Sequence, residues 1–209
     1  MRLDQKIVIV DYGVGNTHSV FKAISVLGYH RVKLSDKESV INDADVLLLP
    51  GVGAFDEAVR NLKSRDLIEI LNEQVLVKKK PILGICVGLQ LFATFSEENG
   101  FHEGLGWIEG AVKKLDLEEG FAVPHVGWNN VILAEKQPLF TGNSDNSNFY
   151  FDHSYAMECV DEHVAAYCDY GKKITAAVQK ENIFGVQFHP EKSQTNGLKL
   201  FRSFFNSIQ

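Results

Sequence analysis

A single cysteine, Cys86, stands between two glycines in the segment PILGICVGLQLF, residues 81–92. The apolar run before it is typical of a buried strand and the residues after it are typical of a helix, so Cys86 falls at a strand-to-helix turn. Small neighbours allow such a turn to be sharp and to display a nucleophile above a sheet. The plainer interpretation is a packed core cysteine, with Gly84 and Gly88 allowing the helix and the strand to approach closely.

A cysteine nucleophile needs a base, and the base needs a group that orients it. The segment GVQFHPEKS places His189 two residues before Glu191, and Pro190 marks the end of a strand because proline cannot donate to a sheet ladder. Residues two apart on an extended chain face the same side, so Glu191 can hold the ring of His189. The alternative is an ordinary strand end with a solvated glutamate. A zinc-deaminase interpretation of the His-x-Glu pair fails because its P-C-x-x-C partner is absent, and we expect no metal.

Two glycine-rich loops also follow strand patterns. The first, GVG at residues 13–15, does not continue as a dinucleotide-binding G-x-G-x-x-G motif, because the third position is His18. The second, PGVG at residues 50–53, would present main-chain N–H groups at the carboxyl edge of a sheet. That edge is where open parallel sheets bind ligands, so this loop suits an oxyanion or a substrate.

The elements that must position these residues alternate in the first half of the chain. Buried strands are predicted at residues 6–11, 45–50 and 81–86, and helices at 16–27, 54–63, 66–78 and from 87 onward, with Asn16 and Asp66 as N-cap candidates. This alternation predicts an α/β fold with an open, mostly parallel central sheet flanked by helices. Shorter strand patterns in the second half predict additional antiparallel or mixed strands, before a final helix over residues 196–208. Because no linker divides the chain, we expect a single domain over residues 1–209.

Composition excludes several classes of protein. The 209 residues are 45% hydrophobic and 23% charged, which is typical of a globular protein. The net charge of −6 argues against a nucleic-acid surface, and no apolar run approaches the roughly 20 residues of a membrane span. The three cysteines, Cys86, Cys159 and Cys168, form no disulfide framework. We therefore expect a cytoplasmic protein with reduced cysteines.

Six motifs together resemble a known family. GICVGLQ, PGVGAF and GVQFHPEKS are similar to the class I (triad) glutamine amidotransferases, which have a flavodoxin-like fold. DYGVGN, VPHVGWN and YFDHSY resemble, more narrowly, the glutaminase subunit of imidazole glycerol phosphate synthase and its close paralogs. The motifs occur in the family's order and the resemblance covers nearly the whole chain.

The resemblance implies a mechanism that needs no cofactor. The Cys86 thiolate would attack the side-chain amide carbon of L-glutamine, His189 would act as general acid and then general base, and Glu191 would orient His189. In this family the oxyanion strand can rest with one N–H turned away until the partner is engaged. The implied oxyanion and substrate contacts are Gly51, Val52, Gly53, Val87, Gln90, His153, Ser154 and Tyr155.

The resemblance also implies a partner. The family passes ammonia through an internal path to a (β/α)₈-barrel synthase subunit, with which it forms a heterodimer for histidine biosynthesis. By position, Asn16, Trp128, Tyr150 and Lys192 would face that subunit. The alternatives are that Asn16 only caps its helix, Trp128 belongs to the core and Lys192 is merely solvated.

Some features depart from the family pattern and leave the ammonia acceptor open. Asp152 stands where the family has an apolar residue, and Trp107 stands where a smaller aliphatic residue is usual. Strand alternation points Asp152 away from the His153 side. The tail EKSQTNGLKLF is closer to paralogs that supply ammonia for nucleotide-sugar amidation in surface polysaccharide biosynthesis. A stand-alone cysteine hydrolase such as a peptidase, and a non-catalytic binding subunit, are disfavoured by the full motif set.

Overall fold

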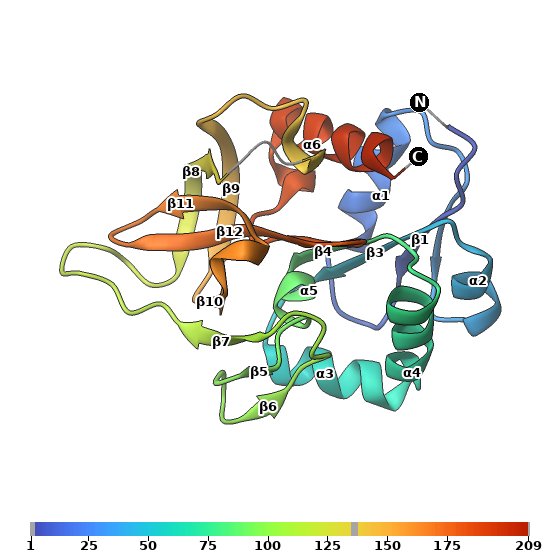
Figure 1. Ribbon diagram of the computed structural model, residues 1–209, viewed down its shortest axis with the longest axis horizontal. Helices are drawn as coiled ribbons and strands as arrows, with labels where there is room; N and C mark the ends of the chain where they lie inside the picture. Colours follow the sequence, from blue (N-terminus) through green and yellow to red (C-terminus); the bar gives the residue numbers. More distant parts are fainter. Residues whose placement is uncertain (1–2, 135–137, 209) are drawn as a thin grey trace.

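The computed structural model describes residues 3–134 and 138–208. Strands and helices alternate in the first half of the chain, and strands predominate in the second (Figure 1). The strands are β1 (Ile7–Val10), β2 (Val32–Ser35), β3 (Val46–Gly51), β4 (Ile82–Cys86), β5 (Phe95–Ser96), β6 (His102–Glu103), β7 (Gly110–Lys114), β8 (His125–Leu133), β9 (Ser147–His153), β10 (Tyr155–Cys159), β11 (Val164–Asp169), β12 (Lys173–Lys180) and β13 (Ile183–Val186). The α-helices are α1 (Thr17–Val26), α2 (Glu38–Asp43), α3 (Phe55–Ser64), α4 (Leu67–Asn72), α5 (Val87–Gln90) and α6 (Gln194–Ser207).

A nine-stranded sheet forms the centre of the molecule, in the order β2-β1-β3-β4-β13-β12-β11-β8-β9. The five strands from β2 to β13 are parallel, and the strands from β12 to β9 are antiparallel to their neighbours. This arrangement confirms the α/β prediction of a mostly parallel sheet extended by antiparallel strands from the second half.

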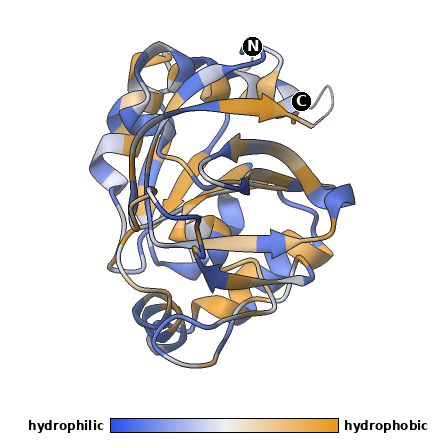
Figure 2. Cartoon of the chain, turned by 90° about the vertical axis from the view of Figure 1, so that its left-hand side faces the viewer, coloured by the Kyte–Doolittle hydropathy of each residue, from blue (hydrophilic) through white to orange (hydrophobic). Residues whose placement is uncertain are grey.

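The two faces of the parallel part are covered by different helices. Figure 1 shows α1 and α6 on one side of the sheet and α3, α4 and α5 on the other. Because helices exclude water from both faces, strands β1, β3 and β4 are buried along their whole length, which accounts for their continuous apolar sequences. Figure 2 colours the chain by hydropathy, and several of its strands are mainly orange, the hydrophobic end of the scale. Among residues 3–134 and 138–208, no helix is long and apolar enough to cross a membrane.

A second, four-stranded sheet has the order β10-β7-β5-β6 and was not predicted from the sequence. It replaces most of the helix expected beyond residue 87, because α5 ends at Gln90. The carbonyl oxygens of Leu91, Phe92 and Ala93 accept hydrogen bonds from the N–H groups of residues 105, 108 and 106 rather than from a continuing helix. The loop over residues 104–108 thus terminates the helix, through contacts that no local pattern reveals.

The two predicted N-cap residues stand at the N-cap positions of α1 and α4, but in the part of the chain that the structure describes neither side chain makes a cap hydrogen bond. Asp66 adopts a left-handed backbone conformation, with φ +55°, and its side chain makes no cap bond to the described residues of α4. That helix passes into a π-helical turn, Glu73–Val77, within the predicted 66–78 segment. Asn16 precedes α1, but its side-chain amide donates a hydrogen bond to Glu191 instead of capping the helix.

Strand β2 and helix α2 were not recognised in the sequence, because β2 is only partly buried and α2 is a short segment of six residues.

Candidate active site

Cys86 ends β4 in a strained backbone conformation, with φ +55° and ψ −112°. A non-glycine residue persists in this region only where its surroundings hold it there, which is common at active sites. The glycines around it make the sharp turn possible: a Cβ on Gly88 would lie 1.7 Å from the Leu49 carbonyl oxygen, and a Cβ on Gly84 would lie 2.7 Å from the main chain of Gly88. The glycines therefore serve close packing of α5 on the sheet and display Cys86 at the same time.

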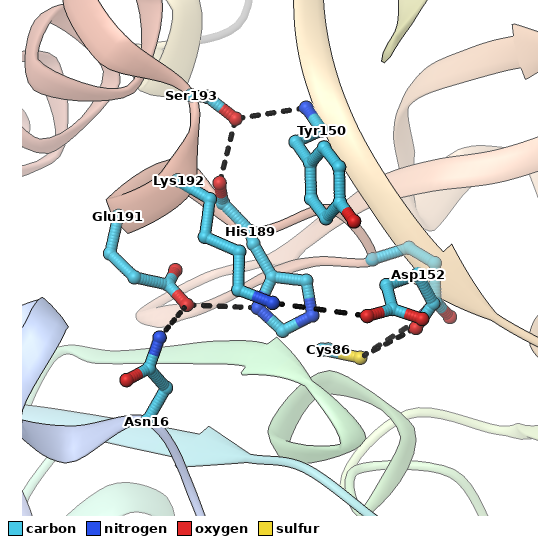
Figure 3. Close-up of polar contacts among 9 residues, drawn as sticks. Asn16, Cys86, Tyr150, Asp152, His189, Glu191, Lys192 and Ser193 are labelled. Carbon is cyan, nitrogen blue, oxygen red and sulfur yellow. Dashed lines mark hydrogen bonds and ion pairs between the residues drawn. The ribbon is translucent and has the colours of Figure 1, made fainter. Parts of the chain in front are cut away.

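His189 and Glu191 lie on the turn that follows β13, beside the end of β4. The Nδ1 atom of His189 is 2.9 Å from Oε1 of Glu191, and both side chains are buried. We predicted an extended chain from His189 to Glu191. Instead, Pro190–Lys192 forms a 3₁₀ turn that brings the Glu191 carboxylate back to the His189 ring. Asn16 Nδ2 donates to the same Glu191 oxygen at 3.2 Å, so the carboxylate is held from two sides (Figure 3).

The surroundings of His189 favour its charged form. Burial lowers the pKa of the imidazolium, but hydrogen bonds to Cys86 and Glu191 and the negative charges of these groups outweigh burial and raise the pKa to about 10. Figure 3 shows the imidazole between the Glu191 carboxylate and the Cys86 sulfur. The arrangement can therefore hold an imidazolium next to a thiolate, which is the charge state that a cysteine nucleophile requires.

The side chains of Cys86 and His189 line a cavity of about 150 Å³ at the carboxyl ends of the parallel strands. Its walls are Val52, Gly53, Cys86, Val87, Gln90, Glu98, Asp152, His153, Ser154, Tyr155, His189 and Lys192. Of the oxyanion and substrate residues predicted from the sequence, only Gly51 does not line this cavity. Gly51 pairs with Cys86 in the β3–β4 register, and a Cβ there would lie 2.5 Å from the Tyr12 hydroxyl.

Main-chain segments flank Cys86 on two sides. Because α5 begins at Val87, the N–H of Val87 has no partner within the helix. The segment of Gly51, Val52 and Gly53 runs along the other side of Cys86, at the end of β3. Two such groups flanking a nucleophile form an oxyanion hole when both point at the developing charge.

Two residues near Cys86 were not predicted: Glu98, which lines the cavity, and Gln187, which contacts the Cys86 sulfur. Glu98 accepts a hydrogen bond from the N–H of Phe55 at 2.9 Å, and burial raises the pKa of its carboxyl. Nothing in the charged segment SEENG singles it out. Gln187 is 0% exposed, which is unusual for a glutamine, and the signal available in the sequence was its place between Val186 and Phe188 in an apolar strand motif.

The residues predicted to face a partner fall into two places. Trp128 is 48% exposed and stacks edge-to-face with Tyr150 across β8 and β9, and Nζ of Lys192 lies 5.2 Å from the centre of the Tyr150 ring. We call Trp128, Tyr150 and Lys192 the aromatic patch. Asn16 instead contacts Glu191, within the candidate catalytic group.

Asp152 lies between the cavity and the aromatic patch. Its side chain is exposed while those of Phe151 and His153 are buried, as strand alternation predicts. Its carboxylate is 3.8 Å from Nζ of Lys192, so the two charges pair at the rim of the cavity (Figure 3).

Trp107, the other departure from the family pattern, is buried. It stacks on Phe92 and donates a hydrogen bond to Asn72, which is a packing role. Within the described part of the chain, no three His, Cys, Asp or Glu side chains are grouped to hold a metal ion.

The chain resembles known proteins over nearly its whole length. The family model for glutamine amidotransferase class-I matches residues 8–208. Imidazole glycerol phosphate synthase subunit HisH 2 of Vibrio vulnificus is 46% identical over 204 residues, covering 98% of this chain and 95% of the relative. Subunit HisH 1 of Campylobacter jejuni subsp. jejuni is 48% identical over 198 residues, covering 95% and 98%.

A solved structure shows the same fold at low sequence identity. The structure of PurLQS from Thermotoga maritima superposes with a TM-score of 0.73 at 19% identity, covering 99% of this chain and 100% of that one. The family match extends across both the parallel and the antiparallel strands, and includes Cys86, His189 and Glu191. The chain therefore belongs to the class-I glutamine amidotransferase family of enzymes.

Proposed function

We propose that this protein hydrolyses L-glutamine to glutamate and ammonia through a thioester on Cys86. The observation that carries the proposal is the buried group of Cys86, His189 and Glu191, of which Cys86 and His189 line one cavity. A single glutamine amidotransferase domain over residues 1–209 would carry this activity, since one sheet takes strands from both halves of the chain. The cavity is small, which suits a single amino acid better than the extended chain that a peptidase must accommodate.

The geometry supports the following chemistry. The Cys86 thiolate attacks the side-chain amide carbon of glutamine, and the N–H groups of Val87 and of the Gly51–Val52 segment hold the oxyanion. The imidazolium of His189 gives its proton to the leaving ammonia. Neutral His189 then takes a proton from water as the water attacks the thioester, and the C–S bond breaks to restore the thiolate. Glu191 holds the Nδ1 side of His189 throughout.

The relatives are named as subunits of imidazole glycerol phosphate synthase, which implies a partner subunit. We propose that the partner here is a (β/α)₈-barrel synthase subunit that receives the ammonia for imidazole glycerol phosphate synthesis. The aromatic patch supports this, because exposed Trp and Tyr are enriched at interfaces and the patch continues from the rim of the cavity.

A second acceptor, a nucleotide sugar for surface polysaccharides, is favoured by one observation. Asp152 places a carboxylate at the rim where the family pattern is apolar, and it pairs with Lys192 of the aromatic patch. A partner that contacts this ion pair would need polar or charged side chains at that place, whereas a partner that contacts an apolar rim would need apolar ones.

The test is a steady-state glutaminase assay of the chain alone, with a histidine-pathway barrel subunit, and with a sugar-amidation barrel subunit. We expect little activity from the chain alone and a rise of about 100-fold or more with the histidine-pathway barrel and its acceptor, because kinetic coupling can exceed the usual 5–150-fold in affinity. A rise only with the sugar-amidation barrel would favour the second acceptor. A high rate in the chain alone, unchanged by either barrel, would contradict partner control.

A further inference from the structure

Two buried amide groups lie next to Cys86. Gln187 is 0% exposed and Gln90 is 3% exposed, and the Gln90 amide contacts both the Tyr155 main chain and the Gln187 amide. Buried amides of this kind need hydrogen-bond partners, because an unpaired one costs about 1–3 kcal/mol. Their partners therefore determine which way each amide points.

The Tyr155 carbonyl fixes the first amide. A carbonyl oxygen can only accept, so the Gln90 atom at 2.9 Å from it must be the NH₂ nitrogen. The second hydrogen of the same nitrogen points to Oε1 of Gln187 at 3.1 Å. Turning the Gln187 amide over would place two NH₂ groups against each other, so only one orientation of Gln187 satisfies the pair.

That orientation aims Nε2 of Gln187 at the Cys86 sulfur, at a distance of 3.7 Å. Cys86 has a second polar neighbour, the main-chain oxygen of Asp152 at 4.0 Å, to which the thiol S–H can donate. A thiolate has no hydrogen to give, so ionisation removes the bond to Asp152 and strengthens the bond from Gln187.

We propose that Gln187 is a further catalytic residue, which donates from Nε2 to the Cys86 sulfur and stabilises the thiolate. This inference rests on the proposed glutaminase function. When the C–S bond of the thioester breaks, its electron pair returns to the sulfur. The same N–H of Gln187 would then donate again to the negatively charged sulfur. Gln90 is a positioning residue for this step, because its bond to Oε1 of Gln187 holds the Gln187 amide in the orientation that donates to Cys86.

Other groups also act on the ionisation of Cys86 and must be kept constant in the test. The titratable and charged groups that surround it are Tyr12, Glu98, Asp152, His153, Tyr155, His189, Glu191 and Lys192. Gln187→Met leaves all of them in place and removes the amide at nearly equal side-chain length, both the Nε2 donor to Cys86 and the Oε1 acceptor of Gln90. Gln74→Met is the matched control, because Gln74 is equally buried but donates to Asn42 rather than to Cys86.

The measurement is the pH dependence of Cys86 alkylation by iodoacetamide, in a Cys159→Ser, Cys168→Ala background. Burial raises the pKa of Cys159 to about 11 and that of Cys168 to about 12, so both would otherwise react at alkaline pH. We expect Gln187→Met to raise the alkylation midpoint by about one pH unit, which is a tenfold smaller thiolate fraction below the midpoint. Gln74→Met should leave the midpoint unchanged.

An unchanged midpoint in folded Gln187→Met would overturn the role of Gln187. If Gln187→Met does not fold, NMR of the side-chain amides of the unsubstituted protein replaces it. The Gln187 amide protons must then shift with the same midpoint as the ultraviolet absorbance of the thiolate, and the absence of such a shift also overturns the role. Ammonia release by the unsubstituted protein with its partner separates the two proposals, because its absence contradicts the glutaminase function itself.

Discussion

Glu191 holds His189 through one carboxylate oxygen, and that same oxygen also accepts from Asn16. The carboxylate therefore has two effects on the base: it fixes the orientation of the ring, and its charge raises the pKa of His189. Orientation and charge can be separated experimentally, because an amide at position 191 can still accept a hydrogen bond but carries no charge.

We expect His189→Asn to lower the glutaminase rate by about 10²–10⁴-fold, which is the usual contribution of a positioned general acid–base group. Glu191→Gln should cost less, about 10–100-fold, because the base itself remains. It should also lower the pKa of His189 and move the alkaline limb of the pH–rate profile to lower pH. Steady-state kinetics with the partner present measure both effects.

Glu181→Gln is the control, since it removes an exposed carboxylate that pairs with Lys79 outside the cavity. A Glu191→Gln enzyme with the unsubstituted rate and pH profile would reduce the proposed triad to a Cys86–His189 dyad.

Strands β8 and β9 hold a pair of buried histidines, His125 and His153, of which His153 lines the cavity. His153 Nδ1 lies 2.9 Å from the Tyr155 carbonyl and must donate to it, so His153 Nε2 is left to accept from Nδ1 of His125 at 3.1 Å. The ring of His125 is stacked between Phe151 and Tyr170. An added proton on His153 would set two N–H groups against each other, so this pair holds its place only while it is neutral.

This pair makes stability depend on pH. Burial lowers the pKa values of His125 and His153 to about 4, below the ordinary value of 6.5. Between these values the unfolded chain binds protons that the folded chain does not, so stability should fall as the pH drops from about 6.5 to about 4. The slope is at most about 1.4 kcal/mol per pH unit for each histidine. Urea unfolding at a series of pH values measures it.

His125→Phe keeps a stacked ring but removes one titrating group, so we expect a shallower fall in stability below pH 6.5. His30→Gln, an exposed position, should leave the slope unchanged. His189 has the opposite sign, because its raised pKa gives stability that is lost as the pH rises towards about 10. Stability that does not change between about pH 6.5 and 4 would contradict a neutral His125–His153 pair.

The elements differ in how well the sequence predicted them. Strands β1, β3 and β4 were predicted because burial on both faces leaves continuous apolar runs. Helix α5 was predicted too long because its end depends on bonds to the loop over residues 104–108. Asn16 was assigned to a helix cap because its partner, Glu191, is 175 residues away in the sequence. Contacts of that kind are set by the topology of the sheet and leave no local signal.

The whole molecule places the cavity and the aromatic patch next to each other, joined by the Asp152–Lys192 ion pair. Strands β3, β4 and β13 bring Cys86 and His189 to the cavity, while β8 and β9 at the far edge of the same sheet carry Trp128 and Tyr150. A partner seated on the patch would therefore also contact the rim of the cavity, which gives a physical route from docking to catalysis.

We expect Trp128→Ala to weaken partner binding by about tenfold or more, as truncation of an interface tryptophan commonly does. Because Trp128 is half exposed, folding stability should change by no more than about 0.5 kcal/mol. Titration calorimetry with the barrel subunit measures the affinity and thermal unfolding measures the stability.

Val160→Ala removes a similarly exposed hydrophobic side chain away from the patch and should leave binding unchanged. Equal affinities for the two variants would show that the partner binds elsewhere.

The most direct test of the central claim is covalent labelling with a glutamine analogue in which a diazoketone replaces the side-chain amide, followed by peptide mass spectrometry. The account predicts modification of Cys86 alone, protection by excess glutamine, and loss of glutaminase activity in proportion to labelling. Cys159 and Cys168 should remain unmodified, because burial raises the pKa values of both thiols. Labelling of either of these cysteines with Cys86 unmodified, or full glutamine turnover by protein labelled at Cys86, would contradict the account.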